Sequence, residues 1–315
     1  MKLPGIAKFL ALACLLALWP SRGALPQLQD PVGTNAGPFQ FEWHDEPGFR
    51  WANLPQVPQH RAGFTLLSSR TTGIRFTNQL DELASAANRI LLNGAGLATG
   101  DFDNDGLPDI YLCSLSGQSA LYKNLGQMHF QDVTAEAGVS LTNAIARGAV
   151  FADVNGDGRL DLLVSVLGRG VVCFINEGQG RFRNATESAG TSSPFGSVTL
   201  ALADVDGNGT LDLYVANYRA EDIRDRGKVD LLLKNGQVVV PPRLQNRLAV
   251  VNGQVIEYGE PDQLLLNDGF GHFKAASWTD GTFLDEDGHR LTGPPLDWGL
   301  TCAFRDSRMN WKLFR

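Results

Sequence analysis

Short apolar runs separated by turn residues fill the middle of the chain. Three pairs of such runs can be aligned, at residues 97–100 with 110–113, 149–152 with 162–165, and 200–203 with 213–216. The runs are rich in residues that favour β-structure and are too short for typical helices, so the pattern predicts strands. A polar, glycine-containing loop separates the members of each pair and is predicted to connect two strands.

A second pattern follows each pair of runs. An Asn is followed by Gly two residues later and by Phe six residues later, and this holds at Asn124, Asn176 and Asn267. The pattern is typical of a strand, a tight turn and another strand. Each unit therefore predicts four short strands in about fifty residues, the size of a propeller blade. We expect an all-β fold, a partial β-propeller of about three to four four-stranded blades, with residues 88–93 as a strand of a partial blade.

The third unit is interrupted by an insertion at about residues 219–258. Its beginning is highly charged, and its later part contains Asn235-Gly236 and Asn252-Gly253. Asn-Gly pairs of this kind favour type I′ turns, so β-hairpins are predicted. The insertion is interpreted either as a decorated loop or as an excursion that binds a partner on one face of the propeller.

The loops between the paired runs carry the candidate chemistry. They begin at residues 101, 153 and 204 and share carboxylate or amide oxygens at positions 1, 3, 5 and 9, with Gly at position 6. The backbone carbonyl of position 7 can add one more oxygen. The predicted ligands are Asp101, Asp103, Asp105, Leu107 and Asp109 in the first loop, Asp153, Asn155, Asp157, Arg159 and Asp161 in the second, and Asp204, Asp206, Asn208, Thr210 and Asp212 in the third.

Such a set of oxygen ligands favours calcium, which accepts flexible geometry, over magnesium, which prefers a strict octahedron. The loops contain no Cys or His, which disfavours zinc and copper. An EF-hand would need flanking helices and Glu at position 12, where this chain has Leu112, Val164 and Val215. We therefore predict Ca2+ as the cofactor, about three ions at one per loop, with a metal-free Asp-rich turn as the alternative for any single loop.

The first residues have the features of a secretory signal. Lys2 and Lys8 are followed by an apolar stretch that ends at Trp19, and small residues occupy 21–23. The stretch is too short to span a bilayer, so no stable membrane span is expected after cleavage. We predict a signal peptide at residues 1–23, a Pro-rich arm or linker at 24–60, propeller blades at 61–306, and a secreted, periplasmic or extracellular location.

The charge and the cysteine content limit the classes of partner and the redox chemistry that the chain could have. The chain holds 34 acidic and 27 basic residues. Because ten of the acidic residues are loop aspartates, the net charge reflects candidate ligands and argues against nucleic acid as a partner. Three cysteines follow the predicted signal, Cys113, Cys173 and Cys302. Their spacing matches no metal motif, and we expect buried thiols rather than a disulfide scaffold.

The end of the sequence departs from the repeat. Residues 296–306 have the pattern of a strand that enters a fourth loop, but the residues after Asp306 lack the expected oxygens and glycine. The tail at 307–315 is cationic and aromatic, so it is not expected to hold calcium. It is interpreted as the aberrant end of a truncated product.

Together these loops and turns resemble the FG-GAP/VCBS repeats, the calcium-loop β-propellers of the integrin α N-terminal type. Residues 88–113, 149–164 and 259–281 are similar to the cartilage acidic protein (ASPIC/UnbV) family. The resemblance implies calcium-stabilised blades and a role in adhesion or interaction. It implies no catalytic residues.

Three functional interpretations remain open. The first is a secreted calcium-binding module for an unknown protein or glycan ligand, with calcium as a structural ion. The second is a propeller enzyme of the phosphatase or polysaccharide lyase type, which would need an acid–base constellation. We expect His129 and His272 to occupy turns instead, and Asp285, Asp287 and His289 to form either an exposed turn or a further cation site. The third is a non-functional fragment of a truncated gene.

Overall fold

The computed structural model describes residues 43–46, 49–52, 64–306 and 311–314, apart from residues 116, 228, 282, 286 and 297. The chain divides into two compact units, Met1–Thr65 and Leu66–Arg315. In the first unit the described residues form one antiparallel hairpin, β1 (Trp43–Glu46) with β2 (Phe49–Ala52). The predicted signal peptide and the rest of the predicted arm before residue 61 lie outside the described residues. The predicted domain boundaries therefore stay predictions.

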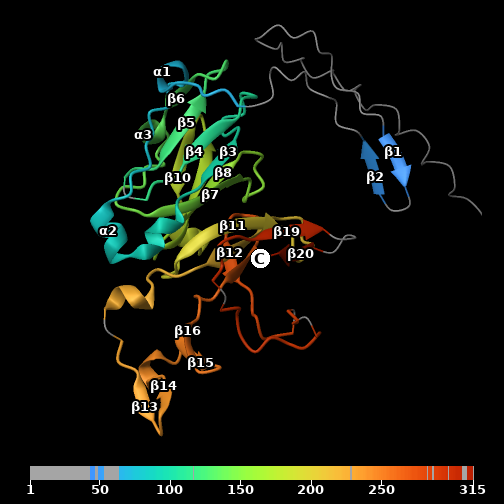
Figure 1. Ribbon diagram of the computed structural model, residues 1–315. Coiled ribbons are helices and arrows are strands. Elements are labelled where there is room, and N and C mark those ends of the chain that lie inside the picture. The colour runs from blue at the N-terminus through green and yellow to red at the C-terminus, as the bar shows by residue number, and fades with distance from the viewer. Residues whose placement is uncertain are drawn as a thin grey trace, which may run out of the picture. The chain divides into compact units, whose positions relative to one another are not determined.

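The second unit holds three four-stranded antiparallel sheets, each built from one repeat of the sequence pattern (Figure 1). The first contains β3 (Leu97–Gly100), β4 (Asp109–Leu112), β5 (Ala120–Asn124) and β6 (Phe130–Asp132). The second contains β7 (Ala146–Ala152), β8 (Asp161–Val166), β9 (Gly170–Gly178) and β10 (Arg181–Asn184). The third contains β11 (Ser197–Ala203), β12 (Asp212–Asn217), β17 (Gln263–Asn267) and β18 (Phe273–Ala275). Strands pair in chain order, which confirms the all-β, propeller-like fold.

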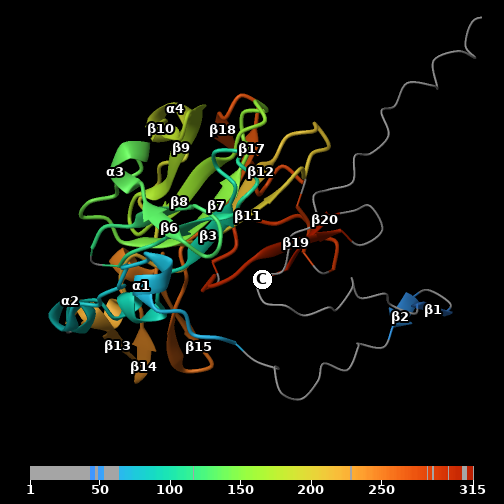
Figure 2. The ribbon, with the colours of Figure 1, turned by 90° about the horizontal axis from the view of Figure 1, so that it is seen from above.

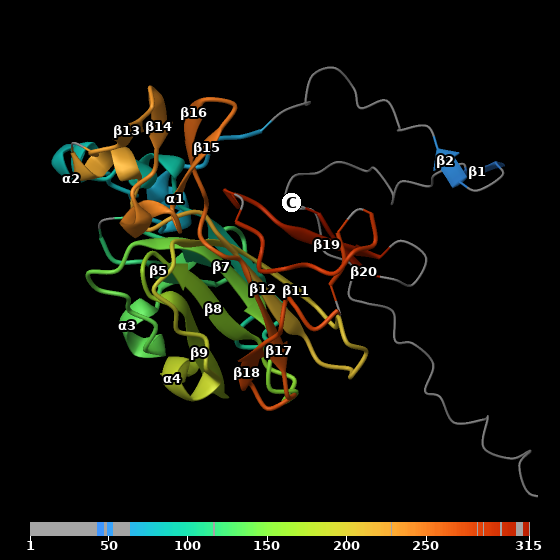
Figure 3. The same cartoon turned by 90° about the horizontal axis from the view of Figure 1, so that it is seen from below.

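The middle sheet is buried on both faces because it packs against a neighbour on each side (Figures 2 and 3). All six residues of β8 are buried. Successive residues of a strand point to opposite faces, so Leu162 packs against the first sheet and Leu163 against the third. This two-sided burial explains why the sequence shows continuous apolar runs instead of alternation.

The two outermost sheet faces are covered by segments outside the sheets. Ile74 and Phe76 pack on the first sheet against the cluster of Ala120, Tyr122 and Phe130. Trp278 and Phe304 pack on the third sheet, where both rings meet Tyr214 edge-on. The sheets therefore present little of their central apolar surface to water.

The insertion lies between β12 and β17 and contains the two predicted hairpins. These are β13 (Leu232–Lys234) with β14 (Gln237–Val239), and β15 (Leu248–Val251) with β16 (Gln254–Glu257). Asn235 and Asn252 both have φ 52°, and positive φ also occurs at the Gly that follows each, as a type I′ turn requires. Two short 3-10 helices, η2 (Ile223–Arg226) and η3 (Pro242–Leu244), complete the insertion. The hairpins lie side by side, away from the sheets (Figures 1 and 3).

The predicted strand at residues 88–93 is wrong, because this segment is helical. It follows α1 (Ser69–Thr72) and α2 (Glu82–Ala87) and forms the 3-10 helix η1 (Arg89–Asn93). The cause is local capping. Asp81 caps α2 by accepting from the Ala84 N–H at 2.6 Å, and Asn88 caps η1 by accepting from the Ile90 N–H at 3.1 Å. An aspartate before an alanine-rich run was the signal for a helix.

Two single helical turns follow the outermost strands of the first two sheets. They are α3 (Thr134–Ala137) and α4 (Thr186–Ala189), and Gly138 and Gly190 end them in the left-handed conformation. No helix among the described residues is long and apolar enough to cross a membrane.

The last strands lie beside the third sheet. β19 (Ala303–Asp306) contacts β11, which agrees with the strand predicted within residues 296–306. It pairs with β20 (Trp311–Phe314), so part of the predicted aberrant tail is a strand. Residues 307–310 and 315 lie outside the described residues.

Candidate cation-binding loops

The three polar loops occupy equivalent places in the three sheets. Each connects the first and second strands, β3 to β4, β7 to β8 and β11 to β12. The strand register closes each loop by pairing Gly100 with Asp109, Ala152 with Asp161, and Ala203 with Asp212. The flanks are strands, as predicted, which excludes an EF-hand.

The aspartate at position 1 organises each loop through backbone amides. Asp101 accepts from the N–H of Asp105 at 3.0 Å and from that of Gly106 at 2.8 Å. Asp153 and Asp204 accept from the equivalent amides at positions 5 and 6. The position-6 glycines have φ between 81° and 87°, and a Cβ there would meet nothing within 4 Å. Glycine is therefore required for backbone conformation and not for space.

The aspartate at position 9 is completely buried in all three loops. Its two oxygens accept from two different backbone segments. In the first loop Asp109 accepts from the N–H of Phe102 at 3.0 Å and from that of Asn124 at 2.7 Å. Asp161 and Asp212 make the same two bonds, to Val154 and Asn176 and to Val205 and Asn267. This residue thus ties the loop to the turn that follows the third strand of the sheet.

Burial makes the charge on these carboxylates costly. Desolvation raises the pKa of Asp109 and of Asp161 to about 6, and it raises the pKa of Asp212 as well. The carboxylates at earlier loop positions add to the shift, for example Asp103 and Asp105 near Asp109. A nearby cation would stabilise the ionised forms.

The predicted carboxylate ligands of the first and third loops lie close together. Carboxylate oxygens of Asp101, Asp103 and Asp109 lie within 4.8 Å of one another, and so do those of Asp204, Asp206 and Asp212. In addition, Asp103 Oδ1 is buried without a hydrogen-bond partner. A buried oxygen without a donor fits a cation as its missing partner.

Residues at positions 5 and 7 mainly form hydrogen bonds within their own loops. The side chains of Asp105, Asp157 and Asn208 accept from the position-7 amides of Leu107, Arg159 and Thr210. In the second loop Asn155 also donates to Asp157 at 2.9 Å. In the third loop Asn208 likewise donates to Asp206 Oδ2, at 3.3 Å.

Two cationic side chains also touch the loops. Lys123 contacts Asp103 and Asp105, and its hydrogen bond lowers the pKa of Asp105. Arg159 Nη2 lies 2.5 Å from Asp157 Oδ2. The sequence pattern did not reveal the role of Lys123, because it belongs to β5 and not to the loop.

The repeated Asn, which the sequence identified only by its spacing, connects neighbouring sheets. Asn176 Nδ2 donates to Phe102 O in the first loop at 2.8 Å, and Asn267 Nδ2 donates to Val154 O in the second loop at 2.8 Å. Both side chains are almost completely buried. The first and second loops are therefore each bonded to the repeated Asn of the next sheet.

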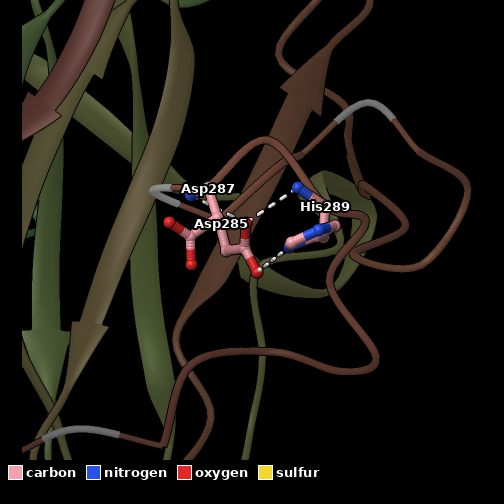
Figure 4. A group of neighbouring side chains, drawn as sticks. All are labelled: Asp285, Asp287 and His289. Carbon is pink, nitrogen blue, oxygen red and sulfur yellow. Dashed lines mark hydrogen bonds and ion pairs between the residues drawn. The ribbon is translucent and has the colours of Figure 1, made fainter.

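A third acidic group lies outside the repeated loops. Asp285, Asp287 and His289 have ligand atoms close together and are all exposed (Figure 4). Asp285 accepts from the N–H of Asp287 at 3.0 Å and from that of His289 at 2.8 Å. These bonds are those of an ordinary Asx turn. His129 and His272 also lie in exposed turns, as predicted, and contact Gln127 O and Asp268 Oδ2 respectively.

The three cysteines that follow the predicted signal are buried thiols that form no disulfide within the described part of the chain. Cys113, Cys173 and Cys302 are all buried. Burial raises the pKa of Cys113 and of Cys173 to about 12. Cys113 and Cys173 belong to the apolar clusters between sheets and contribute to the packing there.

Comparison with known proteins agrees with this geometry. Residues 101–164 and 165–215 match the FG-GAP-like repeat and include all three loops. The chain is 29% identical over 143 residues to cartilage acidic protein 1 of Xenopus tropicalis, and 29% identical over 140 residues to that of Homo sapiens. These alignments cover 43% and 44% of this chain, but 22% and 21% of the relatives. The chain thus spans about a fifth of the length of these relatives, and the predicted resemblance is confirmed.

Proposed function

We propose that this chain, with its FG-GAP-like repeats, is an extracellular interaction module whose blades are held in place by calcium. The observation that carries the proposal is the repetition of one carboxylate arrangement at the same hairpin in three consecutive sheets. Each copy is anchored by a completely buried aspartate. An ordinary Asx turn needs no such residue, since exposed side chains suffice for it.

The residues that would hold the ions follow from the geometry. In the first loop these are Asp101, Asp103 and Asp109, with Asp105 at the exposed side. In the third loop they are Asp204, Asp206 and Asp212. The remaining predicted ligands, and the whole set of the second loop, belong to the same proposal by their equivalent positions. When bound, calcium supplies the positive charge that the grouped carboxylates lack.

The position-9 aspartate would pass this stabilisation on to the rest of the sheet. Asp161 accepts hydrogen bonds from the N–H of Val154 in its own loop and from the N–H of Asn176 in β9, the third strand of the sheet. Asn176 in turn donates to Phe102 O of the preceding loop. A cation that fixes one loop therefore restrains two neighbouring sheets. The ion is structural in this proposal, and no reaction is assigned to the chain.

The insertion is the surface that we propose for a partner. It exposes Leu232, Leu233, Val250, Val251 and Val255 on its two hairpins. Exposed aliphatic side chains gathered on one excursion favour a protein partner over a glycan. An extracellular location is supported by the predicted signal at residues 1–23, and by the calcium concentration outside cells, which suffices for sites with Kd of about 10⁻⁴–10⁻³ M.

Thermal unfolding with and without calcium tests the structural part. We expect millimolar calcium to raise the Tm by several degrees relative to chelated protein, because it binds only the folded loops. The same concentration of magnesium should raise it less. An unchanged Tm in calcium would contradict the proposal.

The interaction part requires a separate assay. Purified chain is applied to immobilised extracellular-matrix proteins and to acidic polysaccharides, in calcium and in chelator. We expect binding to a protein that is lost in chelator and reduced in Leu233→Lys, while Lys274→Leu on β18 serves as a surface control. Binding that is unchanged by chelator and by Leu233→Lys would contradict the proposal that the insertion binds the partner.

A further inference from the structure

A lysine ammonium lies among the carboxylates of the first loop. Lys123 precedes Asn124 at the end of β5. Its Nζ contacts Asp103 Oδ2 and lies 3.1 Å from Asp105 Oδ2. Both carboxylates belong to the set that would hold the divalent ion. The Lys123 side chain is 30% exposed, so its ammonium has a route to solvent.

The second loop has a comparable arrangement from a different position. Arg159 reaches back to Asp157, with Nη2 2.5 Å from Oδ2, and its Nε donates to Asn176 O at 3.0 Å. One positive charge again neutralises a carboxylate of the loop. Two of the three loops thus carry their own cation.

The third loop differs from both. The residues equivalent to Lys123 and Arg159 are Leu266 and Thr210, and the Thr210 hydroxyl bonds Asn208 Oδ1 at 2.6 Å and Asn267 O at 3.0 Å. Within the part of the chain that the structure describes, no Lys or Arg side chain forms an ion pair with Asp204, Asp206 or Asp212. Its carboxylates are free of an internal competitor.

We propose that Lys123 is the built-in counter-ion of the first loop, which a divalent cation must displace, so that the third loop fills at lower calcium than the first. The inference rests on the proposed function, since it concerns the order in which the same loops bind. The physical reason is charge repulsion. An ammonium paired with two candidate ligands repels an incoming divalent cation, and its removal from both carboxylates adds to the free energy that binding must supply.

A calcium titration followed at each loop separately tests the inference. The N–H groups of Gly106 and Gly209 donate to Asp101 and Asp204, so their NMR signals report the first and third loops. The 315-residue chain is labelled with 15N-glycine for this titration. In the unaltered protein we expect the Gly209 signal to reach its midpoint at lower calcium than the Gly106 signal. A Gly106 midpoint at or below that of Gly209 would overturn the proposal without any variant.

Substitution of the lysine provides the second arm. Lys123→Met removes the charge and nearly keeps the length of the side chain. It should lower the calcium concentration at the Gly106 midpoint on the order of tenfold and leave the Gly209 midpoint unchanged. Lys123→Arg should leave the Gly106 midpoint high. Arg183→Met, which removes an exposed charge of β10 paired with Glu177, is the control for net charge.

The outcomes separate the two proposals. If both glycine signals respond to calcium but Lys123→Met leaves the Gly106 midpoint unchanged, the counter-ion role is refuted and the proposed calcium sites stand. If neither signal responds up to millimolar calcium, the proposed function itself fails. A response to Arg183→Met equal to that of Lys123→Met would also refute a specific role for Lys123.

Discussion

Asn176 allows the bond between neighbouring sheets to be measured. Its side chain is completely buried and makes three hydrogen bonds. Nδ2 donates to Phe102 O at 2.8 Å and to Leu160 O at 2.9 Å, and Oδ1 accepts from the Gly178 N–H at 2.9 Å. Asn176→Ala leaves all three backbone groups without this partner. At about 1 kcal/mol for each net bond, we expect the free energy of unfolding to fall by about 3 kcal/mol.

The equivalent residue of the first sheet is a matched control. Asn124 donates to Pro108 O and accepts from the Gly126 N–H, both at 2.9 Å. Among the described residues it makes no bond to another sheet that corresponds to that of Asn176. Asn124→Ala should therefore lower the free energy of unfolding by about 2 kcal/mol. The difference of about 1 kcal/mol between the two variants measures the bond from Asn176 to Phe102 O.

Urea unfolding followed by circular dichroism, at one fixed calcium concentration, provides the comparison. Loss of a bond between sheets should also lower the m-value of Asn176→Ala, because the first sheet becomes free to unfold on its own. Equal costs for Asn124→Ala and Asn176→Ala, with unchanged m-values, would refute the reasoning. Asn267→Ala should behave like Asn176→Ala, since it loses the bond to Val154 O.

Three further predictions concern the loops and the core. Gly158→Ala should lower the free energy of unfolding by about 1–2 kcal/mol in urea titrations, because its φ of 81° strains any residue with a Cβ; a neutral effect would contradict this. In calcium-free buffer the folded-state pKa values of about 6 for Asp109 and Asp161 exceed the unfolded value. The folded state then binds more protons, so urea midpoints should fall as pH rises from about 4 to 6, and a rise would contradict the burial argument. Iodoacetamide at pH 8 should leave Cys113 and Cys173 unlabelled until urea is added, as mass spectrometry can check; rapid native labelling would mean that the thiols are accessible.

The sequence predicted those parts of the fold that local chemistry determines. The Asn-Gly pairs at 235–236 and 252–253 fixed the hairpins of the insertion, because the turn type depends on these two residues alone. The loop flanks were predicted as strands because short apolar runs rich in β-favouring residues are typical of strands. Residues 88–93 were misassigned because their apolar pattern was weighed without the capping residues Asp81 and Asn88.

Other features of the site depend on contacts between distant segments. The acceptor of Asn176 is a backbone carbonyl 74 residues away, which leaves no trace in residue types. Likewise, the sequence gives no sign that Lys123 contacts Asp103, because the two residues meet only when the sheet forms. The loop composition therefore predicted which residues are candidate ligands, whereas the differences among the loops required the structure.

The number of calcium ions bound per chain tests the central claim most directly. Native mass spectrometry or equilibrium dialysis in millimolar calcium should give three ions for the unaltered chain. It should give two for Asp103→Ala and two for Asp206→Ala, because each variant removes a position-3 carboxylate from one loop. A chain that binds no calcium, or the same number of ions in all three proteins, would contradict the account.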